Sequence, residues 1–581
     1  AGDFGGDLDT GGGDDNITIQ NGGSVNNLNA GDGNDTVVVE DGAAVTGDIE
    51  LGDGNDSLNI AELATFDGII NGGTGDDIVT IDFSTGTPGQ PRTITFNGDA
   101  GDDDLVVTGG GATATVDYTV GSTADSGTVA TDLDGNSGTV SDRQTITFTG
   151  LEPVEDTQVA TTFTINGSAS NDTINVTDGN DGVGGLNEVN FNGAFELVRF
   201  SNKTTVEVNG LGGADTVNLN YTSGSASFTA MNVNAGTGSD TVNVQADHLG
   251  NVDGGDDSDQ IVLSDGVSVS GTVGGGIGTD TLNYAAFTTD VAVNLQALSA
   301  TSINGGAAAG VSGFESLTGG SGSDSITAED NANAINITGA NAGNIDAAFS
   351  FSSVENLTGG SNDDSFNFSN AASVAGTVDG GAGGTDTLDY GSYLTAVSVN
   401  LQTSAATGIN AGAAAGFSNI DSVAGGSAAD SITGPDADQT WTITGSEAGN
   451  VASVDFSEFE VLNGGSGDDN FAFNDAVALD FSINGGAENA ADTVTFAASG
   501  SGVSVDVSLL TGIETLTGSG SSDTLVGTSG NDVFDVTGGN AGTVNTNTAF
   551  TTFENLSGAG GDDQFIFGVA TSSISGNVDG Q

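Results

Sequence analysis

Aspartates that follow glycine-rich runs are the residues of this sequence best suited to do chemistry. One such run is Gly-Gly-Thr-Gly-Asp-Asp at 72–77, and similar runs end at Asp324 and Asp469. Glycine adopts the positive φ angles of tight turns without steric cost, so these runs predict loops that expose backbone carbonyls. Calcium takes about six to eight oxygen ligands from carboxylates and carbonyls. The chemistry that these residues indicate is therefore the binding of a hard cation, calcium above all.

Nineteen aspartates occupy this position in the sequence. In seventeen of them the residues two and four positions later are both apolar, as Val79 and Ile81 are after Asp77; the exceptions have Gly434 and Gly527. Alternation with one apolar face predicts a β-strand after each loop. Eighteen of the nineteen are predicted calcium ligands, namely Asp15, Asp35, Asp56, Asp77, Asp103, Asp172, Asp215, Asp240, Asp259, Asp280, Asp324, Asp364, Asp386, Asp430, Asp469, Asp523, Asp532 and Asp563.

The loops differ in how well they match the pattern. Asp492 follows an irregular run, Gly-Gly-Ala-Glu-Asn-Ala-Ala-Asp, and is left out of the prediction. Some loops lack the glycine two positions before the aspartate, and there a plain turn, which Asp and Asn favour, explains the residues equally well. These weaker loops end at Asp172, Asp259, Asp364 and Asp430. Acidic residues inside the loops are candidate secondary ligands: Asp14, Asp32, Asp53 and Asp76.

The loops are variants of the nonapeptide G-G-x-G-x-D-x-U-x, in which U is apolar. In this pattern the sequence resembles surface or secreted proteins of the repeats-in-toxin class, which carry hemolysin-type calcium-binding repeats. The family's tandem blocks are absent here, and the loops are scattered over most of the chain. The resemblance implies a parallel β-solenoid that binds many calcium ions and lies outside the cell or on a bacterial cell surface.

The spacing of the aspartates predicts how the strands stack. From 1 to 110 the spacing is about 21 residues, with one loop per repeat. This period favours an all-β parallel β-solenoid, similar to a β-helix or β-roll, with calcium loops stacked along one edge. From 111 to 165 the pattern fades, which predicts irregular turns or an inserted hairpin. It returns from 166 to 265 as further solenoid.

A longer repeat is present from 266 to 581. Asp280 and Asp386 share the pattern Thr-Asp-Thr-Leu-x-Tyr and lie 106 residues apart, and a third, shortened copy starts at Asp492. Because 106 is close to five times 21, five turns are expected in each copy. These copies resemble the long repeats of very large calcium-binding surface proteins of bacteria. The chain begins at Ala1 and stops where another loop is expected, so we expect a processed product or a fragment.

Composition limits the choice of function. Lys and Arg number 4 against 80 acidic residues, the net charge is −76, and there is no cysteine. Nucleic acid and anionic membrane surfaces bind basic patches, so neither is an expected partner, and no apolar run is long enough for membrane insertion. Stacked loops would place carboxylates about 5 Å apart at a cost of about 3 kcal/mol per pair. Calcium is therefore expected to be structural, and the calcium-free protein partly or wholly unfolded.

These features predict an extracellular structural protein with no catalytic residues: a calcium-rigidified rod in a surface layer, matrix filament or adhesin stalk. Head-to-tail or lateral self-association through calcium is expected, as is contact with acidic glycans or the cell envelope. One alternative is a glycan- or surface-binding adhesin module that uses flat rows of Thr and Asn. Another is a polysaccharide lyase or epimerase, for which 92–203 holds the only Lys and Arg residues. His248 is expected in a surface loop and Trp441 in the core.

Overall fold

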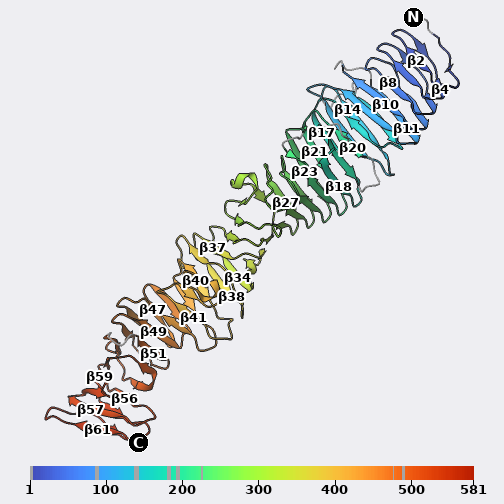
Figure 1. The fold of residues 1–581 in the computed structure, drawn as a ribbon. Coiled ribbons are helices and arrows are strands. Elements are labelled where there is room, and N and C mark those ends of the chain that lie inside the picture. The colour runs from blue at the N-terminus through green and yellow to red at the C-terminus, as the bar shows by residue number, and fades with distance from the viewer. Residues whose placement is uncertain are drawn as a thin grey trace. The chain divides into compact units, whose positions relative to one another are not determined.

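The computed structural model describes residues 4–84, 91–135, 143–179, 185–191, 197–223, 227–475, 477–486 and 491–580. Within these ranges the chain is nearly all β, and its sheets are mostly parallel, which confirms the predicted all-β class (Figure 1). The helical segments there are short 3-10 turns, Asn304–Gly306, Asn410–Gly412 and Val507–Leu509. None of the described helices has the length and apolar character that a membrane crossing requires.

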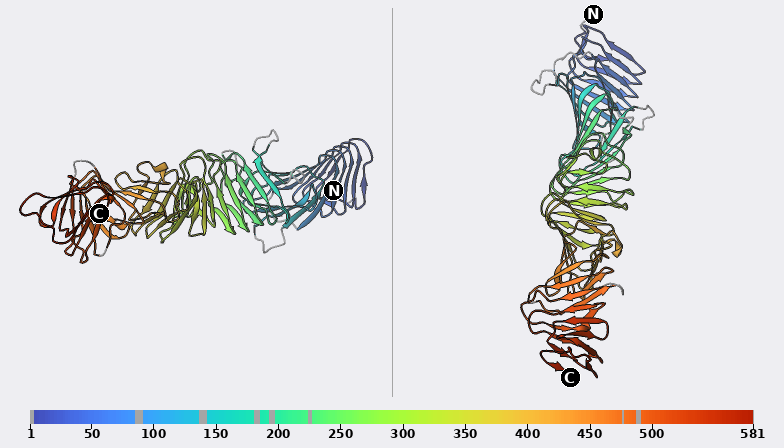
Figure 2. Two further views of the ribbon diagram at one scale, coloured as in Figure 1. Left: turned by 90° about the horizontal axis from the view of Figure 1, so that it is seen from below. Right: turned by 90° about the vertical axis from the view of Figure 1, so that its left-hand side faces the viewer.

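The chain divides into two units, which are described separately. Unit 1 contains Ala1–Val291 and Ala297–Ser321, and unit 2 contains Ala292–Gln296 and Gly322–Gln581. Figure 2 shows the strands from two further sides. In the first part of unit 1 each repeat adds one strand to each of two parallel sheets. One sheet contains β4 (Leu28–Asp32), β7 (Ile49–Asp53), β9 (Ile69–Thr74) and β11 (Arg92–Ala100). The other contains β2 (Asn16–Ile19), β5 (Thr36–Val39), β8 (Ser57–Ile60), β10 (Ile78–Phe83) and β12 (Asp104–Gly109).

The alternating sequence of these strands explains why they stack. Val37, Leu58, Val79 and Leu105 are aligned partners on successive strands, and each is 0% exposed. The side chains between them point outward, since successive residues of a strand face opposite sides of the sheet. Parallel pairing of equivalent residues therefore builds a continuous apolar core between the two sheets.

Antiparallel strands interrupt this order between 111 and 165. The strand β13 (Thr115–Val120) is antiparallel to β14 (Ser126–Asp132), which is antiparallel to β15 (Arg143–Thr149). At the two sides of this group, β15 pairs in parallel with β11, and β13 pairs in parallel with β17 (Ala160–Asn166). A hairpin is thus inserted into the parallel sheet where the loop pattern fades.

The later part of unit 1 resumes the two parallel sheets. The first continues through β21 (Lys203–Asn209), β23 (Ala230–Thr237), β25 (Val252–Asp256) and β27 (Val273–Ile277). The second continues through β22 (Thr216–Asn220), β24 (Thr241–Val244), β26 (Gln260–Leu263) and β28 (Thr281–Asn283). The loops between them carry Asp215, Asp240, Asp259 and Asp280.

The long repeats of unit 2 do not consist of five equal turns, so that expectation is wrong. One sheet contains β45 (Ser431–Thr433), β49 (Val461–Gly465) and β51 (Ser482–Gly486), with register steps of 30 and 21 residues. Over the same stretch the other sheet contains β44 (Ser422–Ala424), β48 (Val454–Ser457), β47 (Ala448–Val451), β46 (Thr440–Gly445) and β50 (Asn470–Phe473). Because β47 is antiparallel to both neighbours, this sheet gains two strands that the first lacks.

Trp441 of β46 is 0% exposed and stacks on Phe471, which confirms its predicted place in the core.

Candidate metal-binding loops

Most of the predicted calcium ligands lie where the chain crosses between the two sheets in the same direction, as Asp77 does between β9 and β10. Asp324, Asp430 and Asp523 lie where the chain crosses back in the opposite direction, so the prediction that all the loops stack along one edge is wrong for these three. Seventeen of the nineteen aspartates are at most 5% exposed, including Asp492, which the sequence pattern had set aside. The other two, Asp15 and Asp563, are partly exposed. The aspartate side chains therefore lie beneath the loop surface, where water screens their charge poorly.

A backbone hydrogen bond connects many of these aspartates to the aspartate of the next repeat. The N–H of Asp35 donates to Oδ1 of Asp56 at 2.7 Å, and the N–H of Asp56 donates to Oδ1 of Asp77 at 2.8 Å. The same bond joins further pairs: Asp15 to Asp35, Asp77 to Asp103, Asp172 to Asp215, Asp215 to Asp240, Asp240 to Asp259, Asp259 to Asp280, Asp364 to Asp386, Asp469 to Asp492 and Asp532 to Asp563. One carboxylate oxygen of each acceptor is thereby satisfied.

The other oxygen, Oδ2, is fully buried and has no hydrogen-bond partner at thirteen of these positions in the described part of the chain. We call the loops that end at these residues the open loops: Asp15, Asp35, Asp56, Asp77, Asp103, Asp215, Asp240, Asp259, Asp280, Asp364, Asp469, Asp492 and Asp563. A buried carboxylate oxygen without a donor carries a large desolvation cost when it is ionised. In each open loop a proton or a cation bound at this oxygen would offset that cost.

The first glycine of the pattern shows what surrounds Oδ2. A Cβ on Gly464 would lie 2.4 Å from Oδ2 of Asp469 and 2.4 Å from the carbonyl oxygen of Gly485 in the next repeat. Gly72 and Gly359 have the same two kinds of oxygen at 2.4–2.6 Å. A carboxylate and a carbonyl oxygen thus approach one glycine from two repeats, and any larger residue would clash with both. This oxygen set is of the kind that calcium prefers.

Burial shifts the ionisation of the same aspartates. Loss of water, together with the weaker effect of neighbouring carboxylate charges, raises the pKa of Asp77, Asp215 and Asp259 to about 7. The N–H donated by the preceding aspartate opposes this shift. For Asp103 and Asp469 burial likewise raises the pKa to about 6. Ionising these loops at neutral pH is therefore unfavourable unless a positive charge is supplied.

Four loops satisfy Oδ2 by themselves, and we call them the closed loops. In each, the residue four positions before the aspartate donates its backbone N–H to Oδ2. The pairs are Ser168 with Asp172, Gly426 with Asp430, Ser519 with Asp523, and Thr528 with Asp532. Asp386 belongs to neither group, because the N–H of Ala382 donates to the carbonyl oxygen of Gly360 instead. The match to the glycine pattern does not predict whether a loop is open or closed. All four of the weaker loops lack the same glycine, yet those of Asp259 and Asp364 are open and those of Asp172 and Asp430 are closed.

The candidate secondary ligands form a second row on the outside. Asp14, Asp32, Asp53 and Asp76 are all exposed. Asp14 accepts the N–H of Asn34 at 2.9 Å, and Asp53 accepts the hydroxyl of Thr74 at 2.9 Å. Among the described residues no group of three or more His, Cys, Asp or Glu side chains converges in a way that could hold a metal. A cation in these loops would therefore depend on backbone carbonyls as well as on the buried aspartate.

Glutamates that the loop pattern did not include accept the same kind of hydrogen bond in place of the next aspartate. Oε2 of Glu315 accepts the N–H of Asp280 at 2.9 Å, and Oε2 of Glu355 accepts that of Asp324 at 2.9 Å. Glu460, Glu514 and Glu554 do the same for Asp430, Asp492 and Asp523. All five stand in the pattern apolar–Glu–x–Leu, as in Phe-Glu-Ser-Leu at 314–317. That recurring pattern was the signal that would have identified them.

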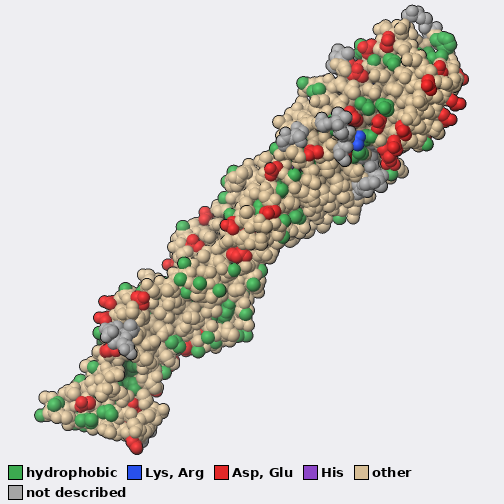
Figure 3. All heavy atoms as spheres, viewed as in Figure 1, with side chains coloured by type: hydrophobic (Ala, Val, Ile, Leu, Met, Phe, Trp, Pro, Cys, Tyr) green, Lys and Arg blue, Asp and Glu red, His purple; other side chains and the backbone are tan. Residues whose placement is uncertain are grey.

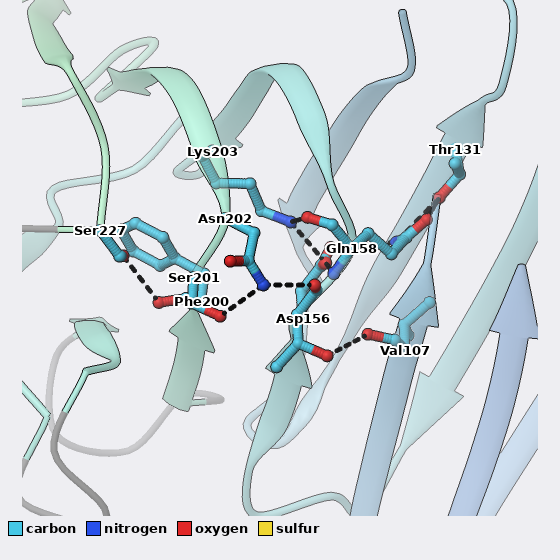
Figure 4. A network of polar contacts seen from close by, with 10 residues as sticks. Val107, Thr131, Asp156, Gln158, Phe200, Ser201, Asn202, Lys203 and Ser227 are labelled. Atoms are coloured by element: carbon cyan, nitrogen blue, oxygen red, sulfur yellow. Dashed lines mark hydrogen bonds and ion pairs between the residues drawn. The ribbon is translucent and has the colours of Figure 1, made fainter. Parts of the chain in front are cut away.

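Lys203, the only lysine, lies in the core of unit 1. Its Nζ donates to Oδ1 of Asp156 at 2.6 Å and to the backbone carbonyl of Gln158 at 2.7 Å (Figure 4). The side chains of Lys203 and Asp156 are 0% and 1% exposed. Gln158 extends the network to the hydroxyl of Thr131 at 3.2 Å. This ion pair joins β16 (Val154–Asp156) to β21, and its burial keeps the ammonium group away from any substrate on the surface.

His248 is buried, so the prediction of a surface loop is wrong. It is 1% exposed, and its Nδ1 lies 3.1 Å from the Tyr221 hydroxyl, which accepts the N–H of Leu249 at 2.9 Å. Burial lowers the pKa of His248 to about 4, so the ring is neutral at physiological pH. His248 is a packing residue whose Nδ1 shares a hydrogen bond with the Tyr221 hydroxyl.

Comparisons with known proteins give no family assignment. No protein-family model matches the chain, and no curated protein matches it significantly.

On the face drawn in Figure 3, acidic side chains gather over the N-terminal strands of unit 1. Function is therefore inferred from the loops and from this charge.

Proposed function

We propose that this protein is an extracellular, calcium-binding structural protein: a parallel β-solenoid whose stacked loops are held together by calcium. One observation carries the proposal. Among the described residues, thirteen loops at equivalent places in the repeats each bury a carboxylate oxygen that receives no hydrogen bond. A cation bound at these oxygens would remove their desolvation cost and would also tie each repeat to the next.

Calcium suits these loops better than other common cations. Carboxylate and carbonyl oxygens are hard ligands, which disfavours copper and zinc, and the chain has no cysteine. Magnesium demands near-ideal octahedral geometry and retains its waters, whereas calcium accepts irregular sets of oxygens. Weak calcium sites are typical of extracellular modules, because calcium is abundant enough there to fill them. We therefore place the protein outside the cell or at a bacterial surface.

A structural role agrees with the repetition and with the charge. Equivalent loops recur in both units, and the one lysine is enclosed in the core. We propose a place in a surface layer, a matrix filament or an adhesin stalk, with self-association through shared calcium. Because its net charge is −76, the protein would bind acidic glycans only through bridging calcium ions.

A second candidate function, glycan binding on a flat strand face, has one observation in its favour. Asn175, Asn218 and Asn243 form a row of side-chain hydrogen bonds, with Nδ2 to Oδ1 distances of 2.8 and 2.9 Å. Such a row presents regularly spaced amides. Because the amides already bond to each other, this candidate ranks below the structural one.

Far-ultraviolet circular dichroism and light scattering during a calcium titration test the proposal. The protein starts in chelator, and calcium is raised to about 10 mM, roughly ten times the dissociation constants of weak extracellular sites. Magnesium serves as the control. We expect a gain of β structure that is specific for calcium, and an increase in particle size if calcium also joins molecules. A spectrum that is β-rich in chelator and unchanged by calcium would contradict the proposal.

A further inference from the structure

We propose that the four closed loops keep their shape without a cation, so that calcium controls folding only where open loops are stacked. This inference rests on the proposed calcium binding and states which loops require it. It divides a chain of similar loops into cation-dependent and cation-independent segments.

The closed loops replace the cation with donors from their own backbone and side chains. Besides the Ser519 N–H on Oδ2, Asp523 receives the Ser519 hydroxyl on Oδ1 at 2.6 Å and the Val503 N–H at 2.8 Å. Asp532 accepts the N–H of Thr528 at 2.7 Å and its hydroxyl at 3.1 Å. A carboxylate with several such donors is stable in its ionised form without a metal.

Three closed loops share one further bond. The hydroxyl oxygens of Ser168, Ser519 and Thr528 each accept the backbone N–H of the residue two positions later, at 3.0–3.1 Å. The hydroxyl thus connects the aspartate to the tip of its own loop. This is the local turn that Ser and Thr favour, and every bond in it lies within six residues.

The open loops have a different backbone at the same position. The residue four before the aspartate has a positive φ in twelve of the thirteen, and in the loop of Asp492 that position lies outside the described residues. Gly31, Gly52 and Gly73, for example, have φ of 107°, 115° and 112° and pair with one another across β4, β7 and β9. The parallel pairing continues through this residue, and its N–H does not reach Oδ2.

The two kinds of loop are grouped along the chain. Five consecutive open loops end at Asp15, Asp35, Asp56, Asp77 and Asp103, and four more end at Asp215, Asp240, Asp259 and Asp280. The closed loops of Asp523 and Asp532 follow each other directly in unit 2. Without calcium, the two open series should lose their structure while the segment around 518–532 retains its own.

Hydrogen–deuterium exchange of the whole chain, in chelator and in calcium, tests this division. We expect exchange in peptides that cover 28–60 and 230–263 to be at least about tenfold faster in chelator, and exchange at 518–532 to change by less than about threefold. Equal acceleration in both kinds of loop would overturn the division. If no peptide responded to calcium, the proposed calcium binding itself would fail.

A loop conversion provides the matched test. Thr528→Gly changes 527–532 to Gly-Gly-Ser-Gly-Asn-Asp, which has the three glycines of the open loop at Asp77 and lacks the hydroxyl, whereas Thr528→Ser keeps both the N–H and the hydroxyl. We expect the Gly variant to acquire at least about tenfold faster exchange at 518–532 in chelator than in calcium, and the Ser variant to behave like the parent. A Gly variant that exchanged equally in both conditions would overturn the proposal. If neither variant folded, the exchange map of the parent chain would still decide.

Discussion

Replacing Asp77 by Asn should have opposite effects in chelator and in calcium. Oδ1 of Asp77 accepts the N–H of Asp56, while its Oδ2 has no donor and approaches the carbonyl side of the next repeat. Asn keeps the accepting oxygen, removes the charge and offers an N–H₂ group in place of Oδ2. The substitution therefore removes a buried negative charge without removing the bond between repeats.

The size of the effect follows from the raised pKa of Asp77. Burial raises that pKa from 3.8 to about 7, so the folded protein binds a proton that the unfolded chain releases. Stability without calcium therefore falls as the pH rises from about 4 to about 7 and stays low above that range. Each pKa unit corresponds to about 1.4 kcal/mol, and water near the loop screens part of this, so about 2 kcal/mol is expected at pH 8.

Urea unfolding in chelator and in calcium, at pH 5 and pH 8, measures this effect. In chelator at pH 8 we expect Asp77→Asn to be about 2 kcal/mol more stable than the parent, with a smaller gain at pH 5. In calcium at about one hundred times its dissociation constant, the parent gains about 2.7 kcal/mol at this site and the variant does not. The variant should then be less stable than the parent by the difference, about 0.7 kcal/mol at pH 8.

Asp523→Asn is the matched control, because Asp523 lies in a closed loop. An amide there would turn N–H₂ toward the N–H of Ser519, leaving a buried donor without an acceptor. We expect a loss of about 1–3 kcal/mol with or without calcium. If Asp77→Asn lost stability in chelator at pH 8 as Asp523→Asn does, the reasoning about the unpaired oxygen would be refuted.

Three further predictions concern the framework. Lys203→Met should cost about 3–5 kcal/mol because it leaves Asp156 charged in the core, and adding Asp156→Leu should recover most of that loss in urea unfolding. Gly73→Ala should cost about 2 kcal/mol or more of unfolding free energy, since φ is 112° and the new Cβ would lie 1.9 Å from a carbonyl oxygen. Gly111→Ala is the control: it has open space around it and should be near neutral in urea unfolding. Trp441→Ala should cost about 3–5 kcal/mol through the cavity it leaves, measured by thermal unfolding; an unchanged midpoint would place Trp441 outside the core.

The apolar alternation was enough to predict the strands and the core. Val79 and Ile81 follow Asp77 with the period of a strand, and both are 0% exposed in β10. Repetition at a nearly constant spacing also indicated parallel pairing, because equivalent strands of successive repeats run in the same direction and align residue by residue. The antiparallel strands of unit 2 escaped this reasoning, since Ala448–Val451 has no distinctive pattern and its place depends on both neighbours.

The sequence by itself determined where the loops lie, which residues enter the core and how strongly the chain is charged, because each follows from local residue type and spacing. Tertiary structure alone decided which carboxylates are satisfied. Ser168, Ser519 and Thr528 hint at closed loops, yet Gly426 closes one too, while Asp99 and Leu211 have the positive φ of open loops without being glycine. The physical reason is that a loop's backbone is fixed by the repeats paired with it, which lie 26 residues away for Asp99 and 19 for Gly236.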